Sequence, residues 1–287
     1  MKVLVTGSKG QLGLEIYKLS NNYKYNWVFT DVQELDLFNL KELNKKLNII
    51  APDIIINCAA YTNVDKAESE PETARVINSH AVDVISKWTF KNNSKLIHIS
   101  TDYVFNGKSS HPLKEDTDTF PINIYGKTKL EGEKKCIQND PKCIVIRTSW
   151  LYSSFGHNFV KVMLDLMLNK KSINVIDDQR GSPTYAEDLA KAILLIINYK
   201  KWIPGIYHYS NEGIVSWYSF ALLIKKLFNF NAEINPVRSS EYVSIAKRPK
   251  YSHLDKSKIK ETYKLTIPTY KSSLEKCVKI LKSMNEK

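Results

Sequence analysis

The chain has 287 residues, of which 43% are hydrophobic, and it carries a formal net charge of +12. This length suits one large or two modest domains with a sizeable core, and the absence of a run of about 20 apolar residues or a signal-peptide pattern predicts a cytoplasmic protein. Only 5 of the 42 basic residues are arginine and the lysines are evenly spread, so we expect no nucleic-acid or membrane partner. The charge can still attract an anionic small substrate.

The first half of the chain alternates short apolar runs with helical patterns. Runs rich in β-branched residues predict buried strands at 2–6, 26–31, 53–60, 95–100 and 143–150. Helices are expected from Gln11, over 71–93 and after Pro121. Strands that are apolar throughout and separated by helices indicate a parallel sheet covered on both faces. The predicted fold is therefore α/β, a Rossmann-type doubly wound parallel sheet.

After about residue 150 this rhythm weakens. Residues 171–197 predict a strand, a Gly-Ser-Pro turn and a helix, and a second strand and helix follow at 205–210 and 216–228. An amphipathic helix is expected over 266–284. We predict a dinucleotide-binding domain over 1–150 and a smaller substrate-binding lobe over 151–287. This boundary is soft, because elements of the second half could cross back into the first.

A glycine-rich turn directly follows the first predicted strand. Gly7, Gly10 and Gly13 form a GxxGxxG pattern between strand and helix. Glycines permit a tight turn and a close approach of the backbone to a pyrophosphate, whose charge the helix N-terminus then favours. The pattern predicts a dinucleotide site, and a purely structural turn is the alternative.

The second strand ends in a carboxylate that bears on the choice of cofactor. Asp31 lies 18 residues after Gly13, where a carboxylate accepts hydrogen bonds from an adenosine ribose. Asp31 favours NADH, whereas Lys9 in the glycine loop offers a positive charge for the 2′-phosphate of NADPH. Small residues in "CAAYT" (58–62) would let a cofactor lie against the backbone, although tight packing explains them equally well.

Three polar residues form the candidate catalytic group. Ligands of a doubly wound sheet bind beyond the carboxyl ends of its strands, where Thr101 and Asp102 emerge. Tyr125 and Lys129 are four residues apart and share one helix face. Tyr125 can protonate a carbonyl oxygen that receives a hydride, Lys129 can lower the pKa of that phenol, and Thr101 can orient the carbonyl. Taken alone, the pair is better explained as a packing tyrosine and a solvated lysine, and the glycine loop and the end of the fourth strand favour catalysis instead.

With these motifs together, the chain resembles the extended short-chain dehydrogenase/reductases and, within them, the dTDP-4-dehydrorhamnose reductases. The similar segments reach from the N-terminus to about residue 252: "GSKGQLG", "PDIIINCAAYTNVDKAESEPE", "STDYVFNGK", "PINIYGKTKLEGE", "RTSWLY", "DDQRGSPT" and "RPKYS". The resemblance implies the last step of dTDP-L-rhamnose synthesis, in which hydride passes from NADPH or NADH to C4 of dTDP-4-dehydro-β-L-rhamnose.

The resemblance also implies roles for individual residues. It makes Tyr125 the proton donor and places Tyr125 and Lys129 against the cofactor. Thr101, Asp102 and Trp150 would hold the sugar nucleotide, and Arg248 would meet its diphosphate, since a guanidinium suits phosphate oxygens. From position alone, Trp150 is equally a core residue. Further cofactor contacts are implied at Gly10, Gln11, Leu12, Asp31, Asp36, Leu37, Ala60, Tyr61 and Thr62.

The metal and the oligomeric state are less defined. The four cysteines and six histidines are dispersed, so the sequence predicts no metal site. The resemblance nevertheless allows Mg²⁺ near a subunit contact, with Glu15 as a candidate ligand, although a glutamate on an exposed helix face is normally only solvated. We expect a monomer or a homodimer.

Two other functions fit the same fold. The first is a sugar-nucleotide epimerase or 4,6-dehydratase, but the dehydratases carry a glutamate where this chain has Tyr103. The second is a non-catalytic, NADP-binding regulatory subunit of the methionine adenosyltransferase type. The complete set of Thr101, Tyr125 and Lys129 favours a working reductase.

Overall fold

The centre of the protein is a six-stranded parallel sheet. The computed structural model describes residues 1–285, and the strand order of this sheet is β10-β5-β4-β3-β1-β2. Every neighbouring pair in this sheet is parallel. The predicted strands are confirmed, with the third and fifth shorter than expected: β1 (Lys2–Thr6), β2 (Asn26–Thr30), β3 (Ile54–Asn57), β4 (Lys95–Thr101) and β5 (Ile144–Thr148), joined by β10 (Gly205–Tyr209).

Helices cover both faces of this sheet, which confirms the doubly wound fold. Successive side chains of a strand point to opposite faces. Val3 and Val5 of β1 accordingly pack in one buried cluster with helices α1 (Gln11–Ser20), α8 (Ala186–Asn198) and α10 (Ser257–Tyr263). Leu4 packs on the opposite side with α2 (Leu40–Ile50), α5 (Ala81–Lys91) and α6 (Ile124–Asn139). The strand order reverses between β1 and β3, and open α/β sheets bind their ligands at such a switch point.

The helix expected over 71–93 is present but is not uniform. It begins as α4 (Pro71–Arg75), widens into the π-helical turn η1 (Val76–His80) and continues as α5. π-turns of this kind are frequent at functional sites. The wide turn brings Asn78 into the interior, where it is 1% exposed.

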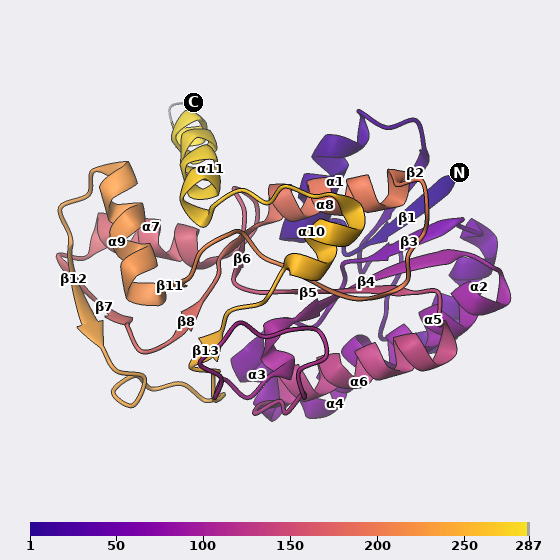
Figure 1. Cartoon of the computed structure of the whole chain (residues 1–287), viewed down its shortest axis with the longest axis horizontal. Coiled ribbons are helices and arrows are strands. Elements are labelled where there is room, and N and C mark those ends of the chain that lie inside the picture. Colours follow the sequence, from indigo (N-terminus) through magenta and orange to yellow (C-terminus); the bar gives the residue numbers. More distant parts are fainter. Residues whose placement is uncertain (286–287) are drawn as a thin grey trace.

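A second, smaller lobe lies beside the sheet (Figure 1). Its core joins α7 (Phe159–Asn169), α9 (Trp217–Phe228) and α11 (Tyr270–Asn285) to the strand pair β7 (Ser172–Ile176) and β12 (Glu233–Val237). Helices α8 and α10 and strand β10 come after residue 150 but pack in the sheet lobe. The sequence analysis allowed for such a return of later elements to the first domain. The division at residue 150 stays a prediction.

Short elements connect the two lobes and border the candidate site. These are α3 (Val64–Ser69), η2 (Asp102–Val104), β6 (Leu151–Tyr152), β8 (Arg180–Gly181), β9 (Thr184–Tyr185), β11 (Val215–Ser216) and β13 (Tyr251–Ser252). Parallel pairing of β13 with β8 brings the segment around residue 251 back toward the middle of the molecule. Among the residues that the structure describes, no helix has the length and apolar character needed to cross a membrane.

Candidate active site

The glycine loop is packed too tightly for larger residues. Gly7 has a φ of +63°, and a Cβ there would lie 2.7 Å from the Ala59 Cα. A Cβ on Gly13 would lie 2.4 Å from the carbonyl oxygen of Gly7. Gly10 precedes α1 without a side-chain cap, so no side chain competes for the amides of the first helical turn. This loop therefore fits a bound pyrophosphate, as the pattern predicted.

Asp31 and Lys9 meet at the rim of this loop. The Asp31 carboxylate accepts a hydrogen bond from the backbone nitrogen of Lys9, at 2.8 Å. The Lys9 ammonium donates to the Gln33 side chain at 3.2 Å and lies 4.0 Å from Glu34. The exposed Lys9 ammonium is thus directed at Gln33 and Glu34 and not at Asp31, and this geometry alone accommodates either NADH or NADPH.

The segment after β3 is held by a residue that the sequence analysis missed. The side-chain oxygen of Asn78 accepts a hydrogen bond from the Tyr61 backbone nitrogen at 2.9 Å. Its side-chain nitrogen donates one to the Tyr61 carbonyl oxygen at 3.1 Å. Its amide nitrogen also lies 3.1 Å from the Thr128 hydroxyl of α6. This contact fixes the backbone between Ala60 and Thr62. The sequence held one indication of this role, because Asn78 is a polar residue on an otherwise apolar helix face.

The remaining predicted cofactor residues lie around the same edge. Leu12 and Leu37 are buried. The Asp36 carboxylate accepts a hydrogen bond from the backbone nitrogen of Phe38. Gln11 has a buried side-chain oxygen without a hydrogen-bond partner in the described residues. Their contacts with a cofactor stay predictions.

The three candidate catalytic residues converge at the carboxyl end of β4. Helix α6 starts with Asn123 as its N-cap, which accepts from Gly126 at 2.7 Å and orients the first turn. Lys129, one turn beyond Tyr125, is 2% exposed and donates to the Ile99 carbonyl oxygen of β4 at 2.7 Å. The ring of Tyr125 is half-buried and packs edge-on against Tyr103, with ring centroids 5.6 Å apart.

Burial shifts the titration of these groups in different directions. It raises the pKa of Tyr125 to about 12, which a hydrogen bond with Thr101 partly opposes. It lowers the pKa of Lys129 to about 8, against the influence of the Glu133 carboxylate. It also raises the pKa of Asp102 to about 7, with hydrogen bonds from Ser252 and Thr101 opposing.

One expectation about Tyr125 is wrong. We expected the Lys129 ammonium to lower the pKa of the phenol, but Thr101 and Asp102 are the polar groups that act on it, and Lys129 is not among them. The physical reason is the direction of the lysine, whose nitrogen is bonded to the Ile99 carbonyl. Tyr125 is thus a protonated phenol at neutral pH.

The predicted substrate residues lie in two places beside this group. Trp150 has a φ of +48°, rare for a bulky residue, and its ring is stacked on Trp217 at 3.5 Å. Arg248 donates to the Asp65 carboxylate of α3 at 2.6 Å. Sequence reasoning missed Trp217 and Asp65 because each acts through a residue far away in the chain. The roles of Trp150, Arg248 and Asp102 toward a substrate stay predictions.

Glu15 does not have the surroundings of a Mg²⁺ ligand. Contrary to expectation it is fully buried, and Ser153 donates to it at 2.6 Å. The Lys18 ammonium lies 3.9 Å from Glu15 and 2.9 Å from Glu187, so a lysine supplies positive charge between these carboxylates. In the described part of the chain, His, Cys, Asp and Glu side chains do not gather in threes as metal ligands do. One buried Glu15 carboxylate oxygen has no hydrogen-bond partner in the described residues, and the positive charge beside it is that of Lys18.

We expect the activity to survive removal of divalent cations. Dialysis against EDTA should change kcat/KM by less than about twofold, because Lys18 already provides the charge near Glu15. Assays with EDTA and with added Mg²⁺ measure this directly. A tenfold loss with EDTA that Mg²⁺ restores would contradict this interpretation.

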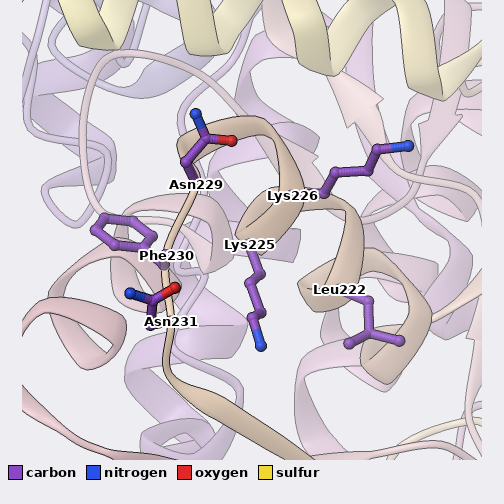
Figure 2. A pocket seen from close by; sticks show the side chains of 6 residues that line it. All are labelled: Leu222, Lys225, Lys226, Asn229, Phe230 and Asn231. Atoms are coloured by element: carbon purple, nitrogen blue, oxygen red, sulfur yellow. The ribbon is translucent and has the colours of Figure 1, made fainter.

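The hollow shown in Figure 2 lies elsewhere, at the C-terminal end of α9 in the smaller lobe. It is lined by Leu222, Lys225, Lys226, Asn229, Phe230 and Asn231, none of which belongs to the predicted site. Its lining contains no hydroxyl, thiol, imidazole or carboxylate side chain. We place the candidate site at the sheet edge for this reason.

Known proteins are similar to this chain over most of its length. The family model described as the RmlD substrate binding domain matches residues 1–283. A dTDP-4-dehydrorhamnose reductase of Aggregatibacter actinomycetemcomitans is 38% identical over 275 residues, covering 91% of this chain and 93% of that protein. The spore coat polysaccharide biosynthesis protein SpsK of Bacillus subtilis is 39% identical over 260 residues, covering 91% of each chain.

Solved structures give the same result for the fold. A dTDP-4-dehydrorhamnose reductase from Clostridium acetobutylicum superposes with a TM-score of 0.94 at 38% identity, covering 98% of this chain and 100% of the other. The reductase of Bacillus anthracis, solved in complex with NADP, has a TM-score of 0.92 at 38% identity, covering 96% and 98%. The similarity therefore includes both lobes.

Proposed function

Because the chain belongs to the family of the RmlD substrate binding domain, we propose that it is an NADPH-dependent dTDP-4-dehydrorhamnose reductase. It reduces C4 of dTDP-4-dehydro-β-L-rhamnose and yields dTDP-L-rhamnose. The observation that carries this proposal is the convergence of Thr101, Tyr125 and Lys129 at the end of β4, beside a glycine loop that fits a pyrophosphate. The NADP complex of the Bacillus anthracis reductase supports the choice of cofactor.

The chain's own residues supply the proton and the orientation. A bound reduced nicotinamide supplies the hydride. Tyr125, protonated at neutral pH, donates its phenolic proton to the C4 oxygen as negative charge develops there. An alkoxide is a stronger base than a phenolate, so the transfer is favourable even from a phenol whose pKa is about 12. Thr101 hydrogen-bonds the carbonyl, and Lys129, whose nitrogen bonds to the Ile99 carbonyl and not to the phenol, would hydrogen-bond the ribose of the nicotinamide.

The substrate residues fit a sugar nucleotide. Trp150 offers an aromatic face for a sugar ring, and its stacking on Trp217 fixes the orientation of that face. Arg248, held by Asp65, has further N–H groups for a diphosphate. Asp102 is buried, with one carboxylate oxygen that has no hydrogen-bond partner in the described residues, so it can accept from a sugar hydroxyl.

A direct assay tests the proposed function. Purified protein is mixed with dTDP-4-dehydro-L-rhamnose and NADPH, and the loss of reduced-cofactor absorbance is followed beside a parallel reaction with NADH. We expect oxidation of the cofactor and one dTDP-L-rhamnose formed per NADPH consumed. Substrate consumption without added reduced cofactor would instead indicate an epimerase or dehydratase, because those enzymes regenerate a bound cofactor. No turnover, with binding of a methionine adenosyltransferase subunit, would indicate the regulatory alternative.

The Lys9 side chain should contribute to the preference for NADPH. We expect Lys9→Gln to raise the KM for NADPH by about 3–5-fold, which is the size of one partly exposed ion pair with a phosphate. The KM for NADH should change by less than about twofold. Lys279→Gln, an exposed change of the same charge on α11, is the matched control. Equal effects of Lys9→Gln on both cofactors would assign another role to this lysine.

A further inference from the structure

A row of buried polar side chains lies beneath the candidate site. It runs from Thr6 on β1 through Asn57 on β3 and His98 on β4 to Lys129 on α6, with exposures of 2%, 1%, 0% and 2%. Such groups are costly to bury unless each is hydrogen-bonded. Of the four, only Lys129 has a part in the proposed chemistry, so the other three require an explanation.

Starting from Thr6, we can assign which group donates and which accepts in each hydrogen bond of this row. The Ala59 backbone nitrogen donates to the Thr6 hydroxyl oxygen at 3.3 Å, so this hydroxyl is free to donate its own proton. It donates to the Asn57 side-chain oxygen at 2.6 Å. The Asn57 amide nitrogen, which can only donate, lies 3.1 Å from Nδ1 of His98. Nδ1 of His98 is therefore an acceptor without a proton.

The other ring nitrogen of His98 consequently carries the proton. Burial and the nearby Lys129 hold the pKa of His98 well below its usual range, so the ring is neutral. A neutral imidazole has one N–H, which must then be on Nε2. Nε2 lies 3.5 Å from the Lys129 nitrogen, which donates at 2.7 Å to the Ile99 carbonyl oxygen.

We propose that His98 is a positioning residue for Lys129, in which Thr6 and Asn57 fix the ring so that an N–H, and not a lone pair, faces the lysine nitrogen. A neutral amine has a lone pair that accepts from this N–H, whereas an ammonium has none. His98 therefore favours release of the lysine proton, while the Ile99 carbonyl keeps the nitrogen in place. The part of this inference that concerns turnover rests on the proposed function.

The other titratable groups that face Lys129 do not favour its neutral form in the way that His98 does. From the end of β3, Cys58 faces the lysine with a pKa that burial raises to about 12. From α6, Cys136 faces it with a pKa that hydrogen bonding to Cys143 and burial raise well above its usual range. Both thiols are neutral near pH 8. Glu133, also on α6, favours the ammonium and so acts against His98.

The tautomer can be tested without any activity. Protein labelled with ¹⁵N-histidine gives long-range ¹H–¹⁵N spectra that distinguish protonated from unprotonated ring nitrogens. His98 is identified among the six histidines as the signal lost in His98→Gln. We expect a neutral ring with its proton on Nε2, and in Asn57→Ala a loss of this single tautomer. A proton on Nδ1 in the unmodified protein, or a charged ring at neutral pH, would overturn the proposal.

The consequence for Lys129 is tested through the pH profile. In His98→Gln the amide nitrogen ends near the position of Nε2 and keeps a donor toward Lys129. In His98→Asn the shorter amide ends near the position of Nδ1 and reaches only Asn57. We expect the rate of reduction to fall above about pH 8 in the unmodified enzyme, as the ammonium is lost. This limit should stay within about 0.3 pH units in His98→Gln and rise by about 0.5–1 unit in His98→Asn.

Each outcome has one interpretation. If both variants lose activity equally at every pH, with the alkaline limit unmoved, His98 only fills space and the positioning role is wrong. If the unmodified protein does not oxidise NADPH with this substrate, the proposed function fails, and the ring spectrum still decides the assignment of His98.

Discussion

Replacing Tyr125 by phenylalanine is expected to lower kcat by about 10²–10⁴-fold, which is the usual contribution of a positioned general acid. The dissociation constant for NADPH should change by less than about twofold. The substitution removes one hydroxyl and keeps the ring, whose edge-on packing against Tyr103 does not depend on the oxygen. Turnover with dTDP-4-dehydro-L-rhamnose and titration with NADPH measure the two quantities separately.

The matched control for this variant is Tyr103→Phe. Tyr103 belongs to the same aromatic pair and follows the β4 strand end, but it has no part in the proposed proton transfer. We expect Tyr103→Phe to retain most of the rate. Unchanged turnover in Tyr125→Phe would remove the mechanism, and equal losses in both variants would mean that packing of the pair, and not the phenolic proton, limits the rate.

The sheet could be predicted from the sequence because its cause is local. Residues 54–56 are apolar on both faces of the strand, and a strand buried on both faces requires this. The glycine loop could be predicted for a similar reason. Gly7 and Gly13 stand where a Cβ would collide with the backbone, a restriction that acts within a few residues of the first strand and on the segment after β3.

Contacts between distant segments could not be predicted in this way. Nothing in the sequence around Glu15 indicates that Ser153, far along the chain, covers it, so an exposed helix face was expected. The same holds for the stacking of Trp217 on Trp150. Tertiary packing decides these contacts, and it also decides the electrostatics that depend on them.

The direction of the Lys129 side chain is the clearest example. Helical spacing placed Tyr125 and Lys129 on one face, and the structure has them on that face. Spacing does not determine whether an ammonium bonds to a phenol or to a strand carbonyl. Here the Ile99 carbonyl of β4 accepts from it, because α6 lies directly against that strand. The sequence therefore located the catalytic group but misjudged the influence of Lys129 on the phenol.

The largest expected loss of stability comes from the buried ion pair between α6 and β5. Arg147 and Glu133 are 3% and 1% exposed at their side chains, and three hydrogen bonds of 2.7–3.1 Å join the guanidinium to the carboxylate. We expect Arg147→Met to lower the free energy of unfolding by about 3–5 kcal/mol, because it leaves the Glu133 charge buried without its partner. Urea denaturation measures this loss.

The double variant separates charge from packing. Arg147→Met with Glu133→Leu removes both charges and should recover most of the lost stability. Lys87→Met breaks an exposed pair with Asp83 and should cost less than about 1 kcal/mol. If the double variant is as unstable as Arg147→Met alone, the guanidinium stabilises the fold through its other contacts, such as the Phe105 ring beneath it.

The same pair also connects stability to the proposed chemistry. Glu133 follows Lys129 by one helical turn and favours its ammonium form. In Arg147→Met the carboxylate loses its partner, so its attraction for Lys129 should increase and the alkaline limit of the rate should rise. In the double variant this attraction is absent, and the limit should fall below that of the unmodified enzyme. Opposite shifts in the two variants would identify Glu133, balanced by Arg147, as one of the groups that set the charge of Lys129; shifts in the same direction would contradict this.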